Sequence, residues 1–134
     1  MIRRRNPIKH LQAAIYSVLS QHQTAPVHDG VPEENTLPCV IISDYEYETV
    51  ASKTEDILEY TIDIEAWSQY DGKTEINEII DDLTQILTAA PLDLSEHGIK
   101  VLSQDVIRGK GVRQEEYYYG VVVLKIEIQN IASA

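Results

Sequence analysis

One stretch of the chain decides the fold: Leu58-Glu59-Tyr60-Thr61-Ile62-Asp63-Ile64-Glu65-Ala66-Trp67. From Leu58 to Ala66, apolar or aromatic side chains alternate with acidic or polar ones. A period of two is typical of a β-strand because successive side chains point to opposite faces of a sheet. We therefore expect a strand with one face buried and the other wet or at an interface.

An amphipathic helix is predicted on each side of this strand. Before it, Asn6-Pro7 supplies an N-cap and a first helical residue, and apolar residues recur at helical spacing over 8–19. This helix should end near 21–23. After the turn Asp71-Gly72, apolar residues recur at the same spacing over 76–87, which predicts the second helix.

Three further strands complete the predicted sheet. Cys39–Tyr45 is short, rich in β-branched residues and largely buried, and it follows a loop that holds a brief extended piece near 27–31. Ile99–Ile107 and Glu116–Gln129 form a hairpin through a glycine loop, Gly109–Gly111. The prediction is an α+β fold of order α-β-β-α-β-β, in which two helices pack on one face of an antiparallel or mixed sheet of about four strands.

The whole chain, residues 1–134, is predicted to form a single domain. We expect exposed, flexible segments at residues 1–6, 46–56, 108–115 and 130–134. No apolar run approaches the length of a membrane span, and no apolar segment follows the N-terminal arginines, so neither a membrane association nor a secretory signal is expected.

Charge is the most unusual feature of the composition. The formal net charge is -11, which argues against tight nucleic-acid binding and favours solubility or a basic partner. Acids dominate residues 29–65, where Lys53 is the only basic residue, whereas basic residues gather over 3–9 and 108–113. A subunit with acidic and basic ends can meet copies of itself head to tail.

The sequence offers little that could carry catalysis. None of the 4 histidines has a second ligand at metal-binding spacing, so we expect solvent-exposed histidines and no metal or cofactor. The single cysteine, Cys39, is expected to be a buried core thiol. Glu59, Asp63 and Glu65 on one strand face could hold Mg²⁺ in a nuclease, but a solvated face with acids opposite Lys125 explains them as well. No catalytic residue is predicted.

Binding to other proteins is expected instead at exposed loops and aromatic side chains. The chain has 8 tyrosines and 1 tryptophan but no phenylalanine, and Tyr117–Tyr119 run together. These aromatic residues lie either at an interface or half-buried in the sheet. The predicted interface residues are Arg3, Arg4, Arg5, Glu46, Glu48, Lys53, Glu55, Asp56, Arg108, Lys110 and Arg113.

An ordered set of short motifs carries a resemblance to a known family. They are Leu11–Tyr16, Asp29–Pro32, Leu37–Ile42, Lys53-Thr54-Glu55, Ala66-Trp67-Ser68, Ala90-Pro91-Leu92 and Gly120–Leu124. In this order, from about residue 11 to residue 128, the chain resembles the tail-completion proteins of long-tailed siphophages, also called tail terminator or tail-to-head joining proteins.

The resemblance implies a non-enzymatic virion protein that is monomeric before assembly. Such subunits form a ring, a hexamer by expectation, that caps the tail tube, binds the tube protein, and joins it to the head connector or neck protein. Genomic DNA passes through the ring without sequence-specific binding, so Glu59, Asp63 and Glu65 are predicted to face the lumen. The protein is expected at the head–tail junction of the virion, after assembly in the bacterial cytoplasm.

Two alternatives to a tail protein stay open from the residues alone. One is an acidic adaptor or inhibitor that binds a basic host protein. The other is a small Mg-dependent nuclease or hydrolase.

Overall fold

The computed structural model describes residues 3–28, 37–69 and 73–131. Its elements follow in the order α1 (Ile8–His22), β1 (Val27–His28), β2 (Cys39–Val50), β3 (Asp56–Ser68), α2 (Lys73–Ala89), a 3-10 helix η1 (Ser95–His97), β4 (Ile99–Arg113) and β5 (Tyr118–Asn130).

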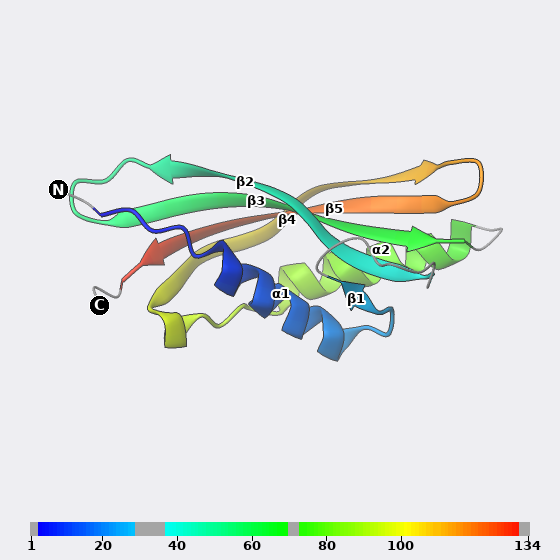
Figure 1. Ribbon diagram of the computed structural model, residues 1–134, viewed down its shortest axis with the longest axis horizontal. Helices are drawn as coiled ribbons and strands as arrows, with labels where there is room; N and C mark the ends of the chain where they lie inside the picture. The colour runs from blue at the N-terminus through cyan, green and yellow to red at the C-terminus, as the bar shows by residue number, and fades with distance from the viewer. Residues whose placement is uncertain (1–2, 29–36, 70–72, 132–134) are drawn as a thin grey trace.

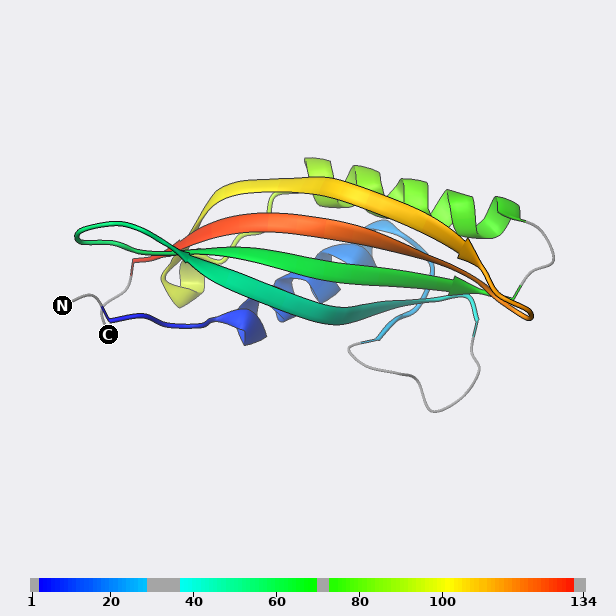
Figure 2. The ribbon, with the colours of Figure 1, turned by 90° about the horizontal axis from the view of Figure 1, so that it is seen from above.

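The strands form one long, twisted sheet with the spatial order β1-β2-β3-β5-β4. β1 pairs with β2 in parallel, and all other neighbours are antiparallel. Both α-helices lie on the same side of the sheet, and the other side is free of helices (Figures 1 and 2). The predicted α+β fold is confirmed. The strand count is five rather than four because Val27–His28 adds a short strand, while residues 29–31 of that extended piece lie outside the described residues.

The alternation along β3 is the framework of the core. Its even-numbered residues from Leu58 to Ala66 are fully or almost fully buried, and its odd-numbered ones are only half-buried. On β5, Val122, Leu124, Ile126 and Ile128 are fully buried on the helix side. The helices cover these strands with Leu11, Ile15, Leu19, Ile76, Ile79, Leu83 and Leu87.

The exposed loop predicted over 46–56 is mostly strand. β2 continues to Val50, β3 begins at Asp56, and only residues 51–55 connect them. The prediction was wrong because Tyr45 to Thr49 alternates aromatic or β-branched residues with acids, and pairing with β3 satisfies the backbone of this segment. Asp56, expected to be exposed, is buried.

The glycine loop predicted at Gly109–Gly111 is also strand. β4 runs on to Arg113, and the turn lies at 114–117, where the amide of Gln114 donates to the carbonyl of Tyr117 at 2.8 Å. Gly109 and Gly111 pair with Val122 and Gly120 and do not adopt a left-handed backbone conformation. These glycines are typical of a turn in the sequence, but here they lie in a paired strand.

Side chains from the sheet fix both ends of α2. The Ser68 hydroxyl lies 2.6 Å from a carboxylate oxygen of Glu75 in the first helical turn, where negative charge is favoured. At the other end, the Gln104 amide donates to the carbonyls of Leu87 and Ala90 at 2.8 and 2.9 Å. Its oxygen accepts from the amide of Leu92 at 3.2 Å. A strand side chain thus satisfies carbonyls that a helix end leaves unpaired.

The first helix begins one residue later than predicted. Pro7 occupies the N-cap position, and the Asn6 side chain accepts a hydrogen bond from the Ile8 amide at 3.3 Å. The same Asn6 oxygen accepts the hydroxyl of buried Tyr60. Burial raises the pKa of Tyr60, so this hydroxyl keeps its proton and remains a donor.

The close approach of α2 to the sheet gives a stability prediction. A side-chain carbon on Gly120 would collide with the Ile80 side chain, whereas one on the directly opposite Gly111 would meet no atom within 4 Å. We expect Gly120→Val to lower the free energy of unfolding by about 1–3 kcal/mol through overpacking. The matched control Gly111→Ala should be neutral or stabilising by about 0.5 kcal/mol. Chemical denaturation measures both, and equal effects would contradict the packing.

Candidate functional site

The helix-free face of the sheet is the main candidate surface. It carries the odd-numbered side chains of β3, including the three predicted lumen residues Glu59, Asp63 and Glu65, all half-buried. Pairing with β2 and β5 sets further charges beside them. The prediction that these three acids share one solvated strand face is confirmed.

One row across this face consists of like charges. Glu48 lies directly opposite Glu59, which in turn lies directly opposite Glu127. Like charges in directly opposed positions destabilise a sheet. Lys125 offsets part of the repulsion, since its Nζ lies 3.6 Å from a carboxylate oxygen of Glu59, as expected for acids facing Lys125 across strands. Such a partly exposed pair contributes only about 0–1 kcal/mol.

A second concentration of acid surrounds Asp63. Burial raises the pKa of this carboxyl, the nearby Asp44 raises it further, and Arg108 opposes them. The three residues line a shallow hollow between β2, β3 and β4, together with Tyr45, Glu46 and Thr61. Over the described residues, no group of three or more His, Cys, Asp or Glu side chains is placed to hold a metal ion.

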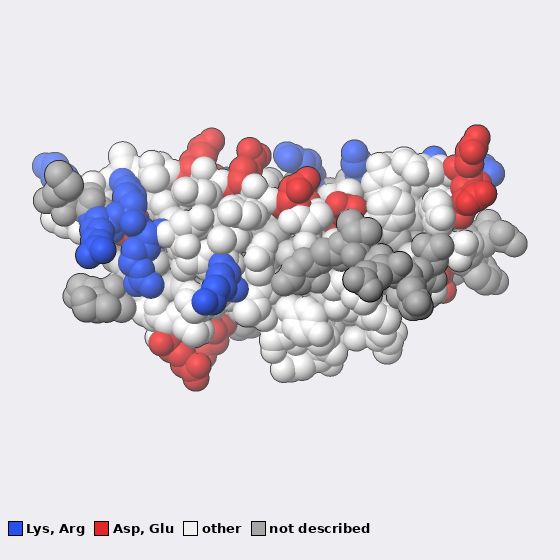
Figure 3. Space-filling model, viewed as in Figure 1, with Lys and Arg blue, Asp and Glu red and all other residues white. Residues whose placement is uncertain are grey.

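Basic side chains lie on the edge strand β4. Arg108 and Lys110 are opposite Val123 and Val121 of β5, so they share the helix-free face, while Arg113 is opposite Tyr118 on the helix side. All three are exposed. In Figure 3, acidic side chains line the part of the upper rim where β2 runs, and basic ones follow farther along it.

At the far end of the face, aromatic rings pack together. Trp67 stacks on Tyr119 with ring centroids 4.8 Å apart and meets Tyr117 edge-on. The Trp67 indole donates to Glu65 at 3.0 Å, and Cys39 is buried beside it on the neighbouring strand. Tyr117, Tyr118 and Tyr119 are half-buried. Burial raises the pKa of the Cys39 thiol, as expected for an inert core cysteine.

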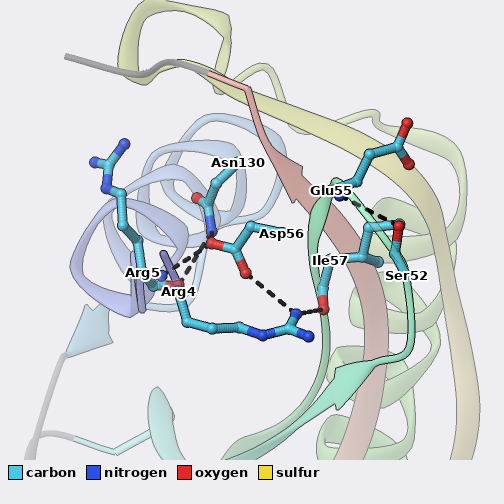
Figure 4. A network of polar contacts seen from close by, with 7 residues as sticks. All are labelled: Arg4, Arg5, Ser52, Glu55, Asp56, Ile57 and Asn130. Carbon is cyan, nitrogen blue, oxygen red and sulfur yellow. Dashed lines mark hydrogen bonds and ion pairs between the residues drawn. The ribbon is translucent and has the colours of Figure 1, made fainter. Parts of the chain in front are cut away.

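The N-terminal arm is clasped to the sheet through Asp56 (Figure 4). The Asp56 carboxylate accepts the backbone amide of Arg5 at 2.9 Å and the amide group of Asn130 at 2.7 Å, and forms an ion pair with Arg4 at 3.4 Å. Arg4 also donates to the carbonyl of Ile57 at 3.2 Å. Arg4 and Asp56, predicted as interface residues in flexible segments, therefore make intramolecular contacts.

The other predicted interface residues remain on the surface. Arg3 and Arg5 in the arm and Lys53 and Glu55 in the β2–β3 turn are exposed. The structure gathers them at one end of the molecule, where both termini lie (Figure 1). Asn130 ends β5, and residues 1–2 and 132–134 of the predicted flexible termini lie outside the described residues.

The histidines are not all exposed, contrary to expectation. His10 of α1 stacks on His97 of η1 with ring centroids 3.8 Å apart, and His10 and His28 are half-buried. The pKa of His10 is lowered, first by burial and then by His97. No local sequence pattern indicates this pair, because its members are far apart along the chain.

A family comparison now assigns the chain to the structural proteins of bacteriophage virions. The model of the family described as Tail completion protein gp17 matches residues 10–128, and the chain belongs to this family. The predicted family resemblance is thereby confirmed. A search of curated proteins finds no match.

One solved structure supports the fold. A chain from the "Virion of native gene transfer agent (GTA) particle" superimposes with a TM-score of 0.68 at 16% sequence identity, covering 91% of this chain and 90% of that one. In the described part of the chain, no helix is long and apolar enough to cross a membrane.

The clasp gives a prediction that separates folding from assembly. Asp56→Ala removes the acceptor of the Arg5 backbone amide and one of the two acceptors of the Asn130 amide group, so the free energy of unfolding should fall by about 1–3 kcal/mol. Glu55→Ala, a change at the adjacent exposed acid, should stay within about 0.5 kcal/mol of the parent chain. Thermal unfolding checks both. Equal losses would mean that Asp56 does not anchor the arm.

Asp63 gives a pH prediction. Because its pKa is raised by folding from an ordinary value of 3.8, the folded chain binds this proton more tightly than the unfolded chain, and stability falls as pH rises through that range. Asp63→Asn should therefore raise the free energy of unfolding at pH 7, and the gain should shrink at pH values below 3.8. The control is Asp82→Asn, at an exposed position of α2. The measurement is urea unfolding across pH. A gain in the free energy of unfolding that does not depend on pH would contradict the idea.

Proposed function

We propose that this chain completes the phage tail: copies form a ring that caps the tail tube and joins it to the head connector. Family membership over residues 10–128 is the observation that carries the proposal. The chain carries unlike charges on separate strands, which supports self-association. A heterologous contact between an acidic and a basic patch builds a ring when its rotation closes.

The helix-free face is proposed to line the lumen. Its aligned glutamates Glu48, Glu59 and Glu127 and the crowded Asp63 oppose folding, so stability alone does not account for them. An acidic wall repels the phosphates of passing DNA and keeps them from binding. Glu59, Asp63 and Glu65 at the middle of the face are then the residues nearest the DNA.

The first experiment removes the gene from the phage that carries it. Electron microscopy should find full heads and separate tails, with tails of irregular length, because nothing stops the tube or joins it to the head. Expression of the wild-type chain in trans should restore joined particles. Normal virions in the deletion mutant would refute the proposed function.

The second experiment tests the lumen. Reversing Glu59, Asp63 and Glu65 to lysine should leave joined particles that deliver DNA poorly, because the wall then attracts phosphate. A matched control reverses three exposed acids in α2 and η1, Glu78, Asp82 and Glu96, and changes the net charge equally. Infectivity per particle and particle morphology are compared. If both triple variants infect equally well, the acidic face does not line the DNA path.

A further inference from the structure

The sheet has two free strand edges. β4 is last in the strand order and pairs only with β5. On the opposite side, β1 pairs with β2 only at Val40 and Ile41, so within the described residues Tyr45–Val50 has no neighbour other than β3. Free edges expose unpaired backbone amides and carbonyls that can add a further strand.

Over residues 108–111, the free edge of β4 carries two cations on one side and only glycines on the other. Arg108 and Lys110 lie on the helix-free face. Gly109 and Gly111 lie on the helix side, and a side-chain carbon on Gly111 would have no atom within 4 Å. All four residues are exposed.

The free edge of β2 has the complementary pattern. Glu46 and Glu48, opposite Thr61 and Glu59, lie on the helix-free face. The intervening Tyr45 and Tyr47 lie on the helix side, with 39% and 44% of their surface exposed. Their rings contact Tyr60 at centroid distances of 6.3 and 5.4 Å.

We infer that the ring forms by strand addition, with β4 of one subunit pairing antiparallel with β2 of the next. The inference rests on the self-association proposed above and names the strands that carry it. In one register, Lys110 falls opposite Glu46 of the next subunit and Arg108 falls opposite Glu48. Opposite charges in directly opposed positions stabilise paired strands.

The same register matches the residues on the other face. It sets Gly111 opposite Tyr45 of the next subunit and Gly109 opposite Tyr47. An aromatic ring that lies across a glycine in the neighbouring strand covers bare backbone, a pairing known to strengthen sheets. A one-residue slip in either direction would place each cation opposite a tyrosine or Thr49 and each glycine opposite an acid, so the alternation excludes slips of one residue.

The antiparallel direction follows from the fold. β2 and β4 run in opposite directions, because three antiparallel pairings separate them. Copies set side by side with their sheets continuing therefore present an antiparallel pair. Within one subunit Lys110 lies in the row of Glu65 and Glu46 in the row of Thr61, so the register shifts each copy by four residues along the strands. A ring accommodates this shift when its axis is inclined to the strands. Register irregularities between Val106 and Arg108 and between Ile42 and Tyr45 bound the regular stretches, which are the ones that match.

The charges also oppose the wrong pairings. Two β4 edges would bring cations together, and two β2 edges would bring acids together. Like charges in directly opposed positions are destabilising. Only the unlike pairing remains, and it is head to tail, which gives a ring where the rotation closes and never a closed dimer.

Disulfide trapping tests the register. Directly opposite residues alternate between two spacings, so two cysteine pairs are made in a Cys39→Ala chain: Lys110→Cys with Glu46→Cys, and Gly111→Cys with Tyr45→Cys. At least one pair should yield a ladder of cross-linked oligomers on mild oxidation, both in concentrated protein and in assembled tails. Mixing two chains with one cysteine each should yield the heterodimer only.

The control keeps one cysteine and moves the other along the same edge, with Lys100→Cys and Glu46→Cys. It should give several-fold less cross-linking, because residue 100 lies at the far end of β4. A ladder no stronger than this control, in both concentrated protein and assembled tails, would overturn the proposed edge pairing.

Charge reversal gives an independent readout. A chain with Arg108→Glu and Lys110→Glu, and another with Glu46→Lys and Glu48→Lys, should each fail to complement the gene deletion. Co-expressed, they should complement, because each then presents the edge charges that the other lacks. Full complementation by each variant alone would refute the edge pairing.

The two proposals fail separately. Ladders from the cysteine pairs with normal virions in the deletion mutant would keep the strand addition and reject the tail-completion role. Separated heads and tails in the deletion mutant, with ladders no stronger than the control, would keep the role and reject the strand addition.

Discussion

The structure depends on the pairing of β3 with β5 along their whole length, from Asp56 opposite Asn130 to Ser68 opposite Tyr118. This pairing puts every second side chain of both strands on the side that the helices cover. The remaining side chains cannot enter that core, because a strand has only two faces. A helix-free surface is thus a geometric consequence of the same alternation that builds the core.

How much of this the sequence could predict depends on the kind of signal. The alternation of Leu58–Ala66 and the helical spacing of 76–87 each identify an element without outside information, and both predictions are confirmed. The second half of β2 also alternates, but its helix-side residues are Tyr45 and Tyr47. Their neighbours in the sequence are three acids and a threonine, so the segment is polar overall and its alternation is easily missed. Gly109 and Gly111 carry a turn signal that pairing with β5 overrides.

The candidate surface was only partly predictable for a similar reason. Local alternation is enough to put Glu59, Asp63 and Glu65 on one face. The row of Glu48, Glu59 and Glu127 requires the register of three strands, which no local pattern contains. The clasp at Asp56 likewise joins residues 51 and 74 positions apart in the chain. Contacts between residues so far apart in the sequence depend on how the strands of the sheet pair.

The charges of this chain act in opposite directions on the approach and on the contact of two copies. A net charge of -11 makes approaching copies repel one another, but salt at physiological strength screens exposed charges beyond about 8 Å. At contact distance the local pairs dominate, and along the inferred seam these are Lys110 with Glu46 and Arg108 with Glu48. A seam of this kind is weak between two copies in solution, because exposed ion pairs contribute little individually. On the proposed function it gains strength when a tube end holds several copies at once, since each added subunit is then bound through more than one contact. We therefore infer that the acidic surface keeps free copies apart and that the tube end, by concentrating them, selects where the ring forms.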